Sequence, residues 1–566
     1  MLGKKSETRE KGVALLVILF IVMTVTVISL GFLSRSDVEL SCGQNMVIHT
    51  QMDYLAESGL EHAKGLILNP QDIASEYWTG ATAQQLAVES DDYYDVNVVK
   101  LGECNYQITS KAYREKNGEQ FGCSNLMAEL RLDPCIAFWS GAGIYIHNRM
   151  NIVGDVYCDG ALVNAGTIDG DSFANTLTGN AITGRLKQTA DLSLNWPALT
   201  FSNLTGNYTK QVLPAGNLNA VVLNTSASIF YFPGDFTIKD NVVINRGLAI
   251  NGNLIIQGSG NVITAAKNAP AVYVSGNLII NNGSGITING ITIVDGKIQM
   301  PMDNSALTVN GALFTKQGVD YYVTDYSSKT NNGTLIGQPK WAQGTINGCV
   351  NFDGVDDYIN MGVMSNVIIN TKLTVSANIK VNAFDRNCQA IVTRGDSSWR
   401  LQRYSDTNRI EFALTDTLGI SHKVIGNINV NDGSWHHVVG VYTNNPGIMY
   451  LYVDGILDNS AIALLATIKN DGAEVFIGEN SGNRGRYWNG LIDDVRVYNI
   501  NLAQSDLANI QNITNNLCGN WKMDWANNST NIIASPAKSA IYTWPAGTKE
   551  QWSPAADAFY KSIQRQ

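Results

Sequence analysis

The pattern of hydrophobic and polar positions first predicts one long helix. Val13 to Leu33 carry no charge, and about twenty apolar residues at 1.5 Å rise span the roughly 30 Å hydrocarbon core of a bilayer. From Ser34 to Leu68 there is no proline, and residues of an apolar stripe recur every three or four positions, which predicts an amphipathic continuation that ends before Pro70. The stripe consists of Val38, Cys42, Met46, His49, Met52, Leu55, Gly59, Ala63 and Leu66.

The residues around the apolar run favour a retained segment over a cleaved export signal. A secretory signal has a shorter apolar stretch of about 7–15 residues and a small-residue cleavage site, whereas SRSDVELS follows here. The leader, residues 1–12, carries Lys4, Lys5, Arg9 and Lys11 against two glutamates. Positive charge keeps a leader cytoplasmic, so we expect a single pass through the inner membrane and an extracytoplasmic body. An anchor and an assembly element both remain open.

A switch to alternating positions after the helix predicts a small head at residues 69–135. YDVNVV, YQITSKAYR and LMAELRL alternate with period two, and Asn117-Gly118 is a hairpin turn signal. A sheet with one apolar face needs a cover, which the amphipathic half of the helix (residues 13–68 as a whole) can supply. We expect an α+β head.

The middle of the chain, residues 136–318, repeats short alternating pieces. GNLIIQGSG and GNLIINNGSG recur at about the length of one β-helix coil. The repeat predicts a β-solenoid with few, irregular coils, interrupted near Leu186 to Pro233; a stack of ordinary hairpins is the alternative. The charged residues of this region are scattered, so we expect them to lie at solvent-exposed turns and to have no catalytic role. They are Asp235, Lys239, Asp240, Arg246, Asp295 and Lys297.

The pattern from 319 to 511 is that of two packed β-sheets. Phe352 and Ile359 alternate with polar neighbours, and Asp454-Gly455 forms a two-residue hairpin corner. His436 and His437 are adjacent in a strand, so they point to opposite faces and cannot share one ligand. Residues 512–566 are rich in tryptophan, which we expect to pack; a return to the solenoid would make the sandwich an insertion. These residues are Trp521, Trp525, Trp544 and Trp552.

Composition narrows the classes of function. The net charge is -10 and 16% of residues are charged, which is typical of β-rich extracellular modules. Nucleic acid is excluded as a partner because there is no basic stripe. The cysteines show no metal-ligand spacing; Cys104, Cys123, Cys135 and Cys158 are near enough in sequence to pair, and buried free thiols are the alternative.

The first seventy residues resemble type IV pilin-like proteins. The segments EKGVALLVILFIVMTV and YLAESGLEHAKGLIL are similar to minor pilins and minor pseudopilins of the PilX and general secretion K type. The resemblance implies cleavage of the leader between Gly12 and Val13 and packing with other pilin-like subunits. Val17 stands where major pilins have a glutamate, which suits a tip or low-abundance subunit.

The sandwich region resembles the LamG-like jelly roll of the concanavalin A-like lectin/glucanase superfamily. The motifs are VNFDGVDDYINMG, DGSWHHVVGVY, MYLYVDGIL and WNGLIDDVRVYNINLAQSDL. The resemblance implies binding without chemistry, and the acidic E-x-D-x-E run that glycosidases on this fold use is absent. Adhesion to a glycan or protein ligand is therefore the expected function; a membrane-anchored carbohydrate-active enzyme and a static surface scaffold are the alternatives.

Two sets of residues are candidate sites in this module. Carboxylates at a sandwich rim can hold Ca²⁺, as members of the superfamily do, or can cap turns and pair with Arg496: Asp353, Asp356, Asp357, Asp493 and Asp494. Aromatic and guanidinium groups suit a sugar groove: Trp399, Tyr404, Arg484, Arg486, Tyr487 and Trp488. No catalytic residue and no other cofactor is predicted.

Overall fold

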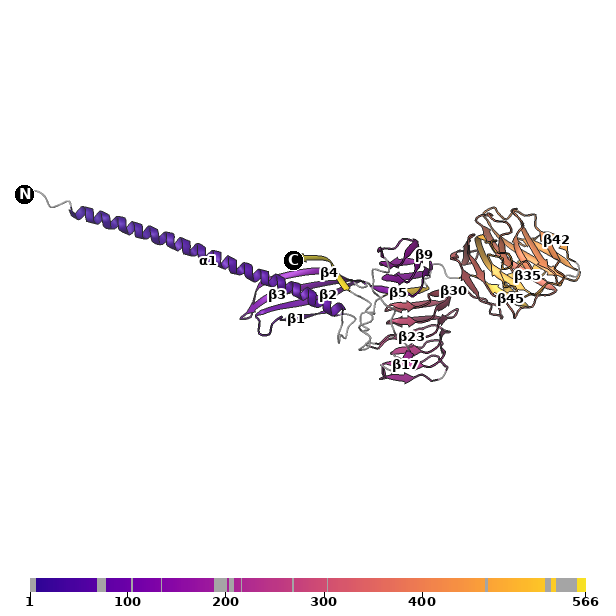
Figure 1. Cartoon of the computed structure of the whole chain (residues 1–566), viewed down its shortest axis with the longest axis horizontal. Coiled ribbons are helices and arrows are strands. Elements are labelled where there is room, and N and C mark those ends of the chain that lie inside the picture. The colour runs from indigo at the N-terminus through magenta and orange to yellow at the C-terminus, as the bar shows by residue number, and fades with distance from the viewer. Residues whose placement is uncertain are drawn as a thin grey trace, which may run out of the picture. The chain divides into compact units, whose positions relative to one another are not determined.

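The structure is a computed structural model that describes residues 7–68, 78–102, 105–133, 135–187, 201–202, 208–214, 216–266, 269–302, 304–463, 467–524, 531–535 and 557–565. The fold is mainly β with one long helix, a solenoid and a sandwich, as predicted (Figure 1). Contacts divide the chain into two compact units, Met1–Asp133 with Asp557–Gln566, and Pro134–Ala556.

The first unit is a helix on a five-stranded antiparallel sheet. The sheet runs in the order β1-β2-β3-β4-β47. Its elements are α1 (Glu7–Leu68), β1 (Gly80–Gln84), β2 (Asp92–Gly102), β3 (Asn105–Lys116), β4 (Glu119–Asp133) and β47 (Asp557–Arg565). The expected turn joins β3 to β4, because Asn117 and Gly118 both have positive φ, at 56° and 83°. The C-terminal strand lies beside β4, a pairing that the predicted head at 69–135 omits.

The second half of α1 covers this sheet. Its buried side chains follow helical spacing, each at most 6% exposed: Met52, Leu55, Ala56, Leu60, Ala63 and Ile67. A Cβ at Gly59 would lie 2.2 Å from Ser110 Oγ on β3, so glycine permits the close approach of helix and sheet. The predicted stripe is correct from Met52 onward only, since Val38 and Met46 are exposed.

The first half of α1 packs against nothing in the described chain. The large apolar side chains from Val13 to Leu33 are 52–70% exposed. Among the described residues, one helix, Val13–Ile67, is long and apolar enough to cross a membrane. This is consistent with a single-pass anchor.

The second unit begins with a solenoid of parallel strands, as predicted. One face is a sheet of ten strands, more coils than the few expected. In spatial order they are β13 (Leu186–Lys187), β11 (Ser172–Phe173), β8 (Asp155–Cys158), β5 (Ile136–Ser140), β29 (Leu313–Thr315), β26 (Thr292–Val294), β23 (Val272–Val274), β20 (Gly247–Ile250), β17 (Ile229–Phe232) and β14 (Lys210–Val212).

The other faces of the solenoid are also parallel. An eight-stranded face contains β10 (Thr167–Asp169), β7 (Met150–Val153), β46 (Ile532–Ser535), β28 (Ala306–Asn310), β25 (Gly285–Asn289), β22 (Asn261–Thr264), β19 (Val243–Ile244) and β16 (Val222–Leu223). The shorter edges are β12 (Thr176–Gly179), β9 (Ala161–Asn164) and β6 (Ile144–Ile146), and β15 (Asn217–Leu218), β18 (Phe236–Ile238), β21 (Leu254–Ile256), β24 (Leu278–Ile280), β27 (Ile298–Pro301) and β30 (Val319–Val323).

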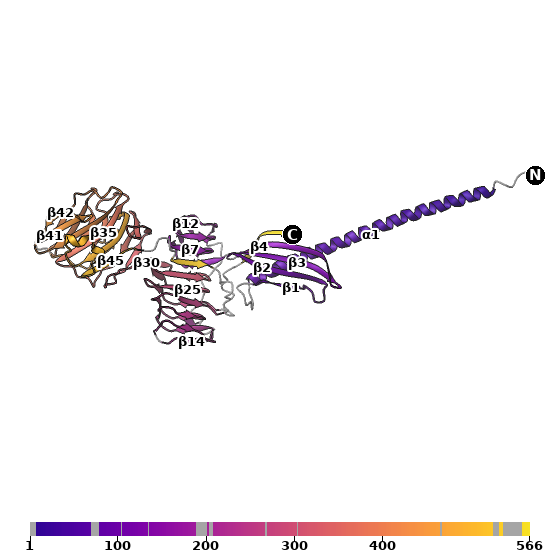
Figure 2. The same cartoon turned by 180° about the vertical axis from the view of Figure 1, so that it is seen from behind.

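The chain builds this solenoid out of sequence order. It enters at β5, proceeds to β13, reappears at the opposite end in β14, and returns coil by coil until β29 pairs with β5. Near the C-terminus, β46 inserts between β28 and β7, where it is the yellow strand beside β7 in Figure 2. The sandwich is thus inserted within the solenoid, and strands β14 to β17 lie in the second half of the expected interruption.

The sandwich consists of two antiparallel layers. One continues the β30 edge through β31 (Gly333–Ile336), β34 (Tyr358–Asn360), β43 (Phe476–Ile477), β36 (Ala390–Thr393), β37 (Trp399–Arg403), β38 (Ile410–Thr415) and β39 (Ser421–Ile425). The other is β32 (Lys340–Gln343), β33 (Gly348–Asp353), β44 (Asn489–Tyr498), β35 (Lys372–Val381), β40 (Trp435–Thr443), β41 (Ile448–Val453) and β42 (Ile456–Ile462), with β45 (Leu517–Trp521) on β44. Two short helices follow β44, α3 (Gln504–Leu507) and the 3₁₀ helix Ile510–Asn512.

The predictions for the C-terminal tryptophans and for the cysteines are confirmed for some of these residues only. Trp521 is buried in β45, while Trp525, Trp544 and Trp552 lie outside the described residues. Cys135 forms a disulfide, and Cys123 and Cys158 are free thiols. Cys104 also lies outside the described residues.

Candidate ligand-binding site

Aromatic rings and arginines gather where two loops meet β34 and β43. The Arg484 guanidinium lies 4.2 Å from the Tyr358 ring centroid and 5.7 Å from that of Tyr487. Phe476 lies under the same group, 4.7 Å from Tyr358 between ring centroids. Arg386, from the loop between β35 and β36, lies over the Tyr487 ring at 5.6 Å. We call these five residues the Arg–Tyr cluster.

A buried carboxylate fixes the loop that carries Arg484 and Tyr487. Glu479 is 0% exposed. Its Oε1 accepts the N–H groups of Asn480 and Arg486 at 2.7 and 2.8 Å, and its Oε2 accepts that of Gly485 at 2.9 Å. Gly485 has φ 95°, which favours glycine in this tight loop. The loop is therefore ordered before any ligand arrives.

Arg486 is committed to the scaffold. Its guanidinium donates to both carboxylate oxygens of Asp396, at 2.8 and 3.1 Å, and to Gln402 Oε1 at 3.2 Å. Burial alone would raise the pKa of Asp396, but the charges of Arg486 and Arg400 lower it overall. Arg486 therefore joins its loop to Asp396 and Gln402 of the scaffold and has a structural role.

Three other residues that we expected to line a sugar groove lie elsewhere in the sandwich. Trp399 and Trp488 are 1% and 0% exposed, so the prediction that they stack on a ligand is wrong: both indoles fill the interior of the sandwich. Tyr404 is half-buried in another environment, with Arg409 and Lys423 over its ring at 5.6 and 5.1 Å. Of the six predicted residues, Arg484 and Tyr487 come together within the Arg–Tyr cluster.

Three of the five predicted carboxylates converge. Carboxylate oxygens of Asp353, Asp356 and Asp357 all lie within 4.8 Å of one another, and oxygen ligands of this kind suit Ca²⁺. Asp357 is buried and accepts the Gln338 N–H at 2.5 Å. Burial raises its pKa to about 7, with the neighbouring carboxylates adding to the rise and the Gln338 N–H opposing it. At neutral pH a proton competes with any cation here.

The other two carboxylates have protein partners. Asp493 accepts the Thr345 N–H and hydroxyl at 3.0 and 2.7 Å, and burial raises its pKa to about 7. Asp494 pairs with Arg496 at 2.9 Å, the alternative that the sequence offered. Both carboxylates therefore stabilise the local backbone and side-chain packing of the sandwich.

The two adjacent histidines point to different environments, as predicted. His436 Nδ1 lies 2.9 Å from Asp454 Oδ2, and its Nε2 lies 3.1 Å from Asp432 Oδ1. Burial alone would lower the pKa of His436, but these carboxylates raise it overall. Burial lowers the pKa of His437. The pair offers no shared ligand.

Comparison with known proteins gives a family match within the sandwich. Residues 353–508 match the concanavalin A-like lectin/glucanases superfamily. No curated protein matches the chain.

Solved structures similar to the chain include the binding domain of Paraclostridial Mosquitocidal Protein 1 (15% identity, 34% of this chain and 52% of that one, TM-score 0.27). Domain 4 of the GH43 extracellular arabinanase AbnA from Geobacillus stearothermophilus, in complex with arabinotriose, is 17% identical over 34% of this chain and 98% of that one (TM-score 0.26). The binding domain of botulinum neurotoxin serotype G is 16% identical over 33% and 47% (TM-score 0.27). The chain spans about half the length of the two toxin domains.

Sequence reasoning missed three members of the cluster in this lectin-like domain. Tyr358 and Phe476 read as ordinary strand residues, and Arg386 lies in a loop about a hundred residues before Tyr487. One sequence feature could have indicated the cluster: Arg484, Arg486 and Tyr487 lie within four residues of one another in a chain that is acidic as a whole. The partners become visible only through the order β34-β43-β36.

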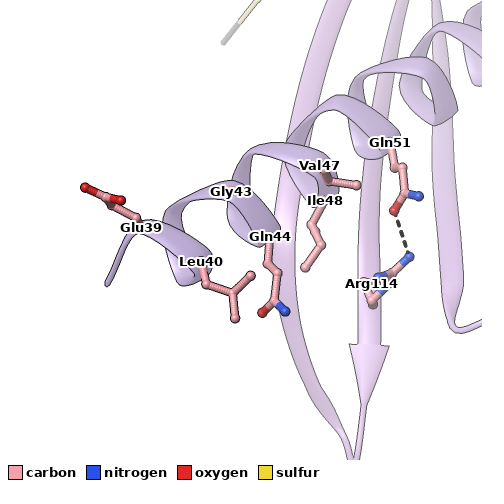
Figure 3. A pocket seen from close by; sticks show the side chains of 8 residues that line it. All are labelled: Glu39, Leu40, Gly43, Gln44, Val47, Ile48, Gln51 and Arg114. Atoms are coloured by element: carbon pink, nitrogen blue, oxygen red, sulfur yellow. Dashed lines mark hydrogen bonds between the residues drawn. The ribbon is translucent and has the colours of Figure 1, made fainter. Parts of the chain in front are cut away.

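The first unit has a separate hollow on α1 (Figure 3). A groove of about 650 Å³ lies between the helix and the end of β3, lined by Glu39, Leu40, Gly43, Gln44, Val47, Ile48, Gln51 and Arg114. Arg114 donates to Gln51 Oε1 at 3.2 Å and to Asp92. The lining is aliphatic and amide-rich and lies where the helix leaves the sheet.

Proposed function

We propose that the protein is a membrane-anchored, pilin-like surface protein that presents a lectin-like domain to saccharides outside the cell. The observation that carries the proposal is the division of α1 into an apolar half that is exposed and a half that is buried on a sheet. A bilayer, or the helices of other pilin-like subunits, would cover the first half. The lectin-like domain then lies in the body that the anchor retains.

The Arg–Tyr cluster supports binding. Aromatic rings stack on sugar faces, and guanidinium groups donate hydrogen bonds to sugar oxygens. Two acidic groups beside the cluster are already engaged, Glu479 with backbone N–H groups and Asp396 with Arg486. Retaining and inverting glycosidases need two free carboxyl groups about 5–9.5 Å apart, so binding without hydrolysis is the function that these contacts favour.

The anchor is tested by the mass of the mature N-terminus. The full-length chain would be produced in bacterial envelopes with and without a prepilin peptidase and purified in detergent. Processing predicts that the chain starts at Val13 only when the peptidase is present. A Gly12→Leu variant, changed at the proposed cleavage site alone, should stay intact. An intact Met1 in every sample would contradict the pilin-like part and leave a plain anchor.

A further inference from the structure

The Arg–Tyr cluster combines two arginines with three aromatic rings in an acidic protein. The chain carries a net charge of -10, yet two arginines flank one half-buried tyrosine in this cluster. Asp385, next to Arg386 in the sequence, accepts from Gln389 and Asn489 at 3.1 and 2.8 Å. Glu479, 3.8 Å from Arg484 Nε, holds the loop backbone. The cluster therefore presents positive charge that its neighbours only partly balance.

We propose that this cluster selects anionic saccharides, that is, sugars bearing a carboxylate or a sulfate. The inference rests on the proposed function and names its ligand class. A pyranose ring would contact the exposed edge of the Tyr487 and Tyr358 platform, and its anionic group would receive N–H donors from Arg386 and Arg484.

The donors have the geometry for this task. The Arg386 guanidinium donates no hydrogen bond to any described residue, so its planar fork is available to an oxyanion. Arg484 stacks on Tyr358 at 4.2 Å and donates to the Tyr487 hydroxyl at 3.3 Å, while 43% of its side chain is exposed. Stacking on rings holds each guanidinium in place without neutralising it. Little freedom is then lost on binding, which favours affinity.

The test measures binding of the full chain in detergent to two matched pairs of oligosaccharides. One pair is an oligogalacturonate and its methyl ester, and the other is a sulfated oligosaccharide and its desulfated form. The two members of each pair share one sugar backbone, and one member lacks the negative charge because its acidic group is esterified or removed. We expect tighter binding of at least one anionic member and weaker binding at high salt.

Variants connect that preference to the cluster. Arg386→Gln and Arg484→Gln each remove one charge and should weaken anionic binding by on the order of 10- to 100-fold, since hydrogen bonds to charged groups are the strong ones. Arg409→Gln is the matched control, because Arg409 also stacks on a tyrosine of the same sandwich, 5.6 Å from Tyr404, and should change nothing. Equal thermal stability of the three variants shows that folding is intact.

The outcomes separate this inference from the proposed function. Binding of sulfated but not carboxylated sugars, or the reverse, supports the inference and identifies the anion. Equal binding of charged and neutral members, or equal effects of Arg409→Gln and Arg484→Gln, overturns it while the lectin-like function stands. Binding of no saccharide overturns both and favours a protein ligand.

Discussion

The solenoid and the lectin-like sandwich are both β-structures, but they use their polar side chains in opposite ways. In the solenoid, Asp235 Oδ1 accepts the Asn253 N–H at 2.7 Å, Asn253 Oδ1 accepts the Asn277 N–H at 2.9 Å, and Asn277 Oδ1 accepts the Lys297 N–H at 2.8 Å. Each coil thus caps the next. In the sandwich, Arg386 and Arg484 lie on rings with N–H groups to spare. The polar side chains of this ladder hold neighbouring coils together, whereas the two arginines of the Arg–Tyr cluster keep N–H donors for a ligand.

The repeated glycines of the solenoid belong to the same ladder. A Cβ at Gly276 would lie 2.7 Å from the Gly252 carbonyl oxygen, and one at Gly296 would lie 2.5 Å from that of Gly276. Successive coils approach too closely there for any side chain. The G-N pairs of the sequence repeat are therefore steric and hydrogen-bonding requirements of stacking, with no ligand involved.

The largest expected effect comes from breaking the solenoid at its C-terminal strand. Ile532 is 0% exposed in β46, between Leu307 and Met150. Ile532→Ala leaves a cavity and should lower local stability by about 2–5 kcal/mol. Amide hydrogen exchange measures this as faster exchange in β7 and β28, with β40 of the sandwich and saccharide binding unchanged.

The neighbouring residue is the control for this change. Ile533 lies on the other face of β46 and is only half-buried, so Ile533→Ala should have a clearly smaller effect. Equal effects of the two variants would mean that β46 is not a structural part of the solenoid. Loss of saccharide binding in Ile532→Ala would mean that scaffold and recognition are not separable.

A smaller effect distinguishes the acids of the two regions by pH. Asp235 and Asp240 are exposed in the solenoid, whereas Asp357 is buried in the sandwich with its pKa raised from 3.8 to about 7. The folded state therefore holds this proton more tightly than the unfolded chain, and stability falls as pH rises from 3.8 to about 7. The slope per carboxyl is at most about 1.4 kcal/mol per pH unit.

Asp357→Asn should flatten that pH dependence in thermal unfolding of the sandwich. Asparagine keeps one oxygen to accept the Gln338 N–H, and the exposed Asp356→Asn, which removes one charge that adds to the rise, should flatten the pH dependence less. Asp493, whose pKa is also raised to about 7, adds a similar slope that both variants retain. A full slope in Asp357→Asn would show that this carboxyl does not hold its proton in the folded state.

The sequence predicted the elements that local patterning controls, and the tryptophan-rich segment suggested a return to the solenoid, but neither the pairing partners of β46 nor the strand β47 of the head was predicted. The apolar run, the Asn117-Gly118 and Asp454-Gly455 turns and the G-N repeats have local causes, and the structure contains them. The pairing of β46 with β7 depends on contacts across hundreds of residues, as does that of β47 with β4. Both strands lie in segments that look like tail sequence.

The candidate site divides in the same way. Arg484 and Tyr487 were predicted from residue type alone, and the same reasoning chose Trp399 and Trp488, whose rings are buried. Residue type cannot tell a core indole from an exposed one, because both fit a strand. Whether each of these side chains faces the interior of the sandwich or the solvent depends on the order of strands in the two sheets.

The smallest effect tests the polar ladder itself. Asn277→Ala removes the acceptor for the Lys297 N–H while the backbone N–H of residue 277 still donates to Asn253. One neutral hydrogen bond contributes about 0.5–1.5 kcal/mol, so exchange of the Lys297 amide should accelerate by on the order of threefold to tenfold. Asn281→Ala, at the other end of β24, is the matched control, since the Asn281 side chain makes no hydrogen bond to any described residue. If the two variants exchanged equally fast, the asparagines would be turn formers only, and the contrast between a scaffold joined by polar side chains and a partly unpartnered binding surface would lose its strongest support.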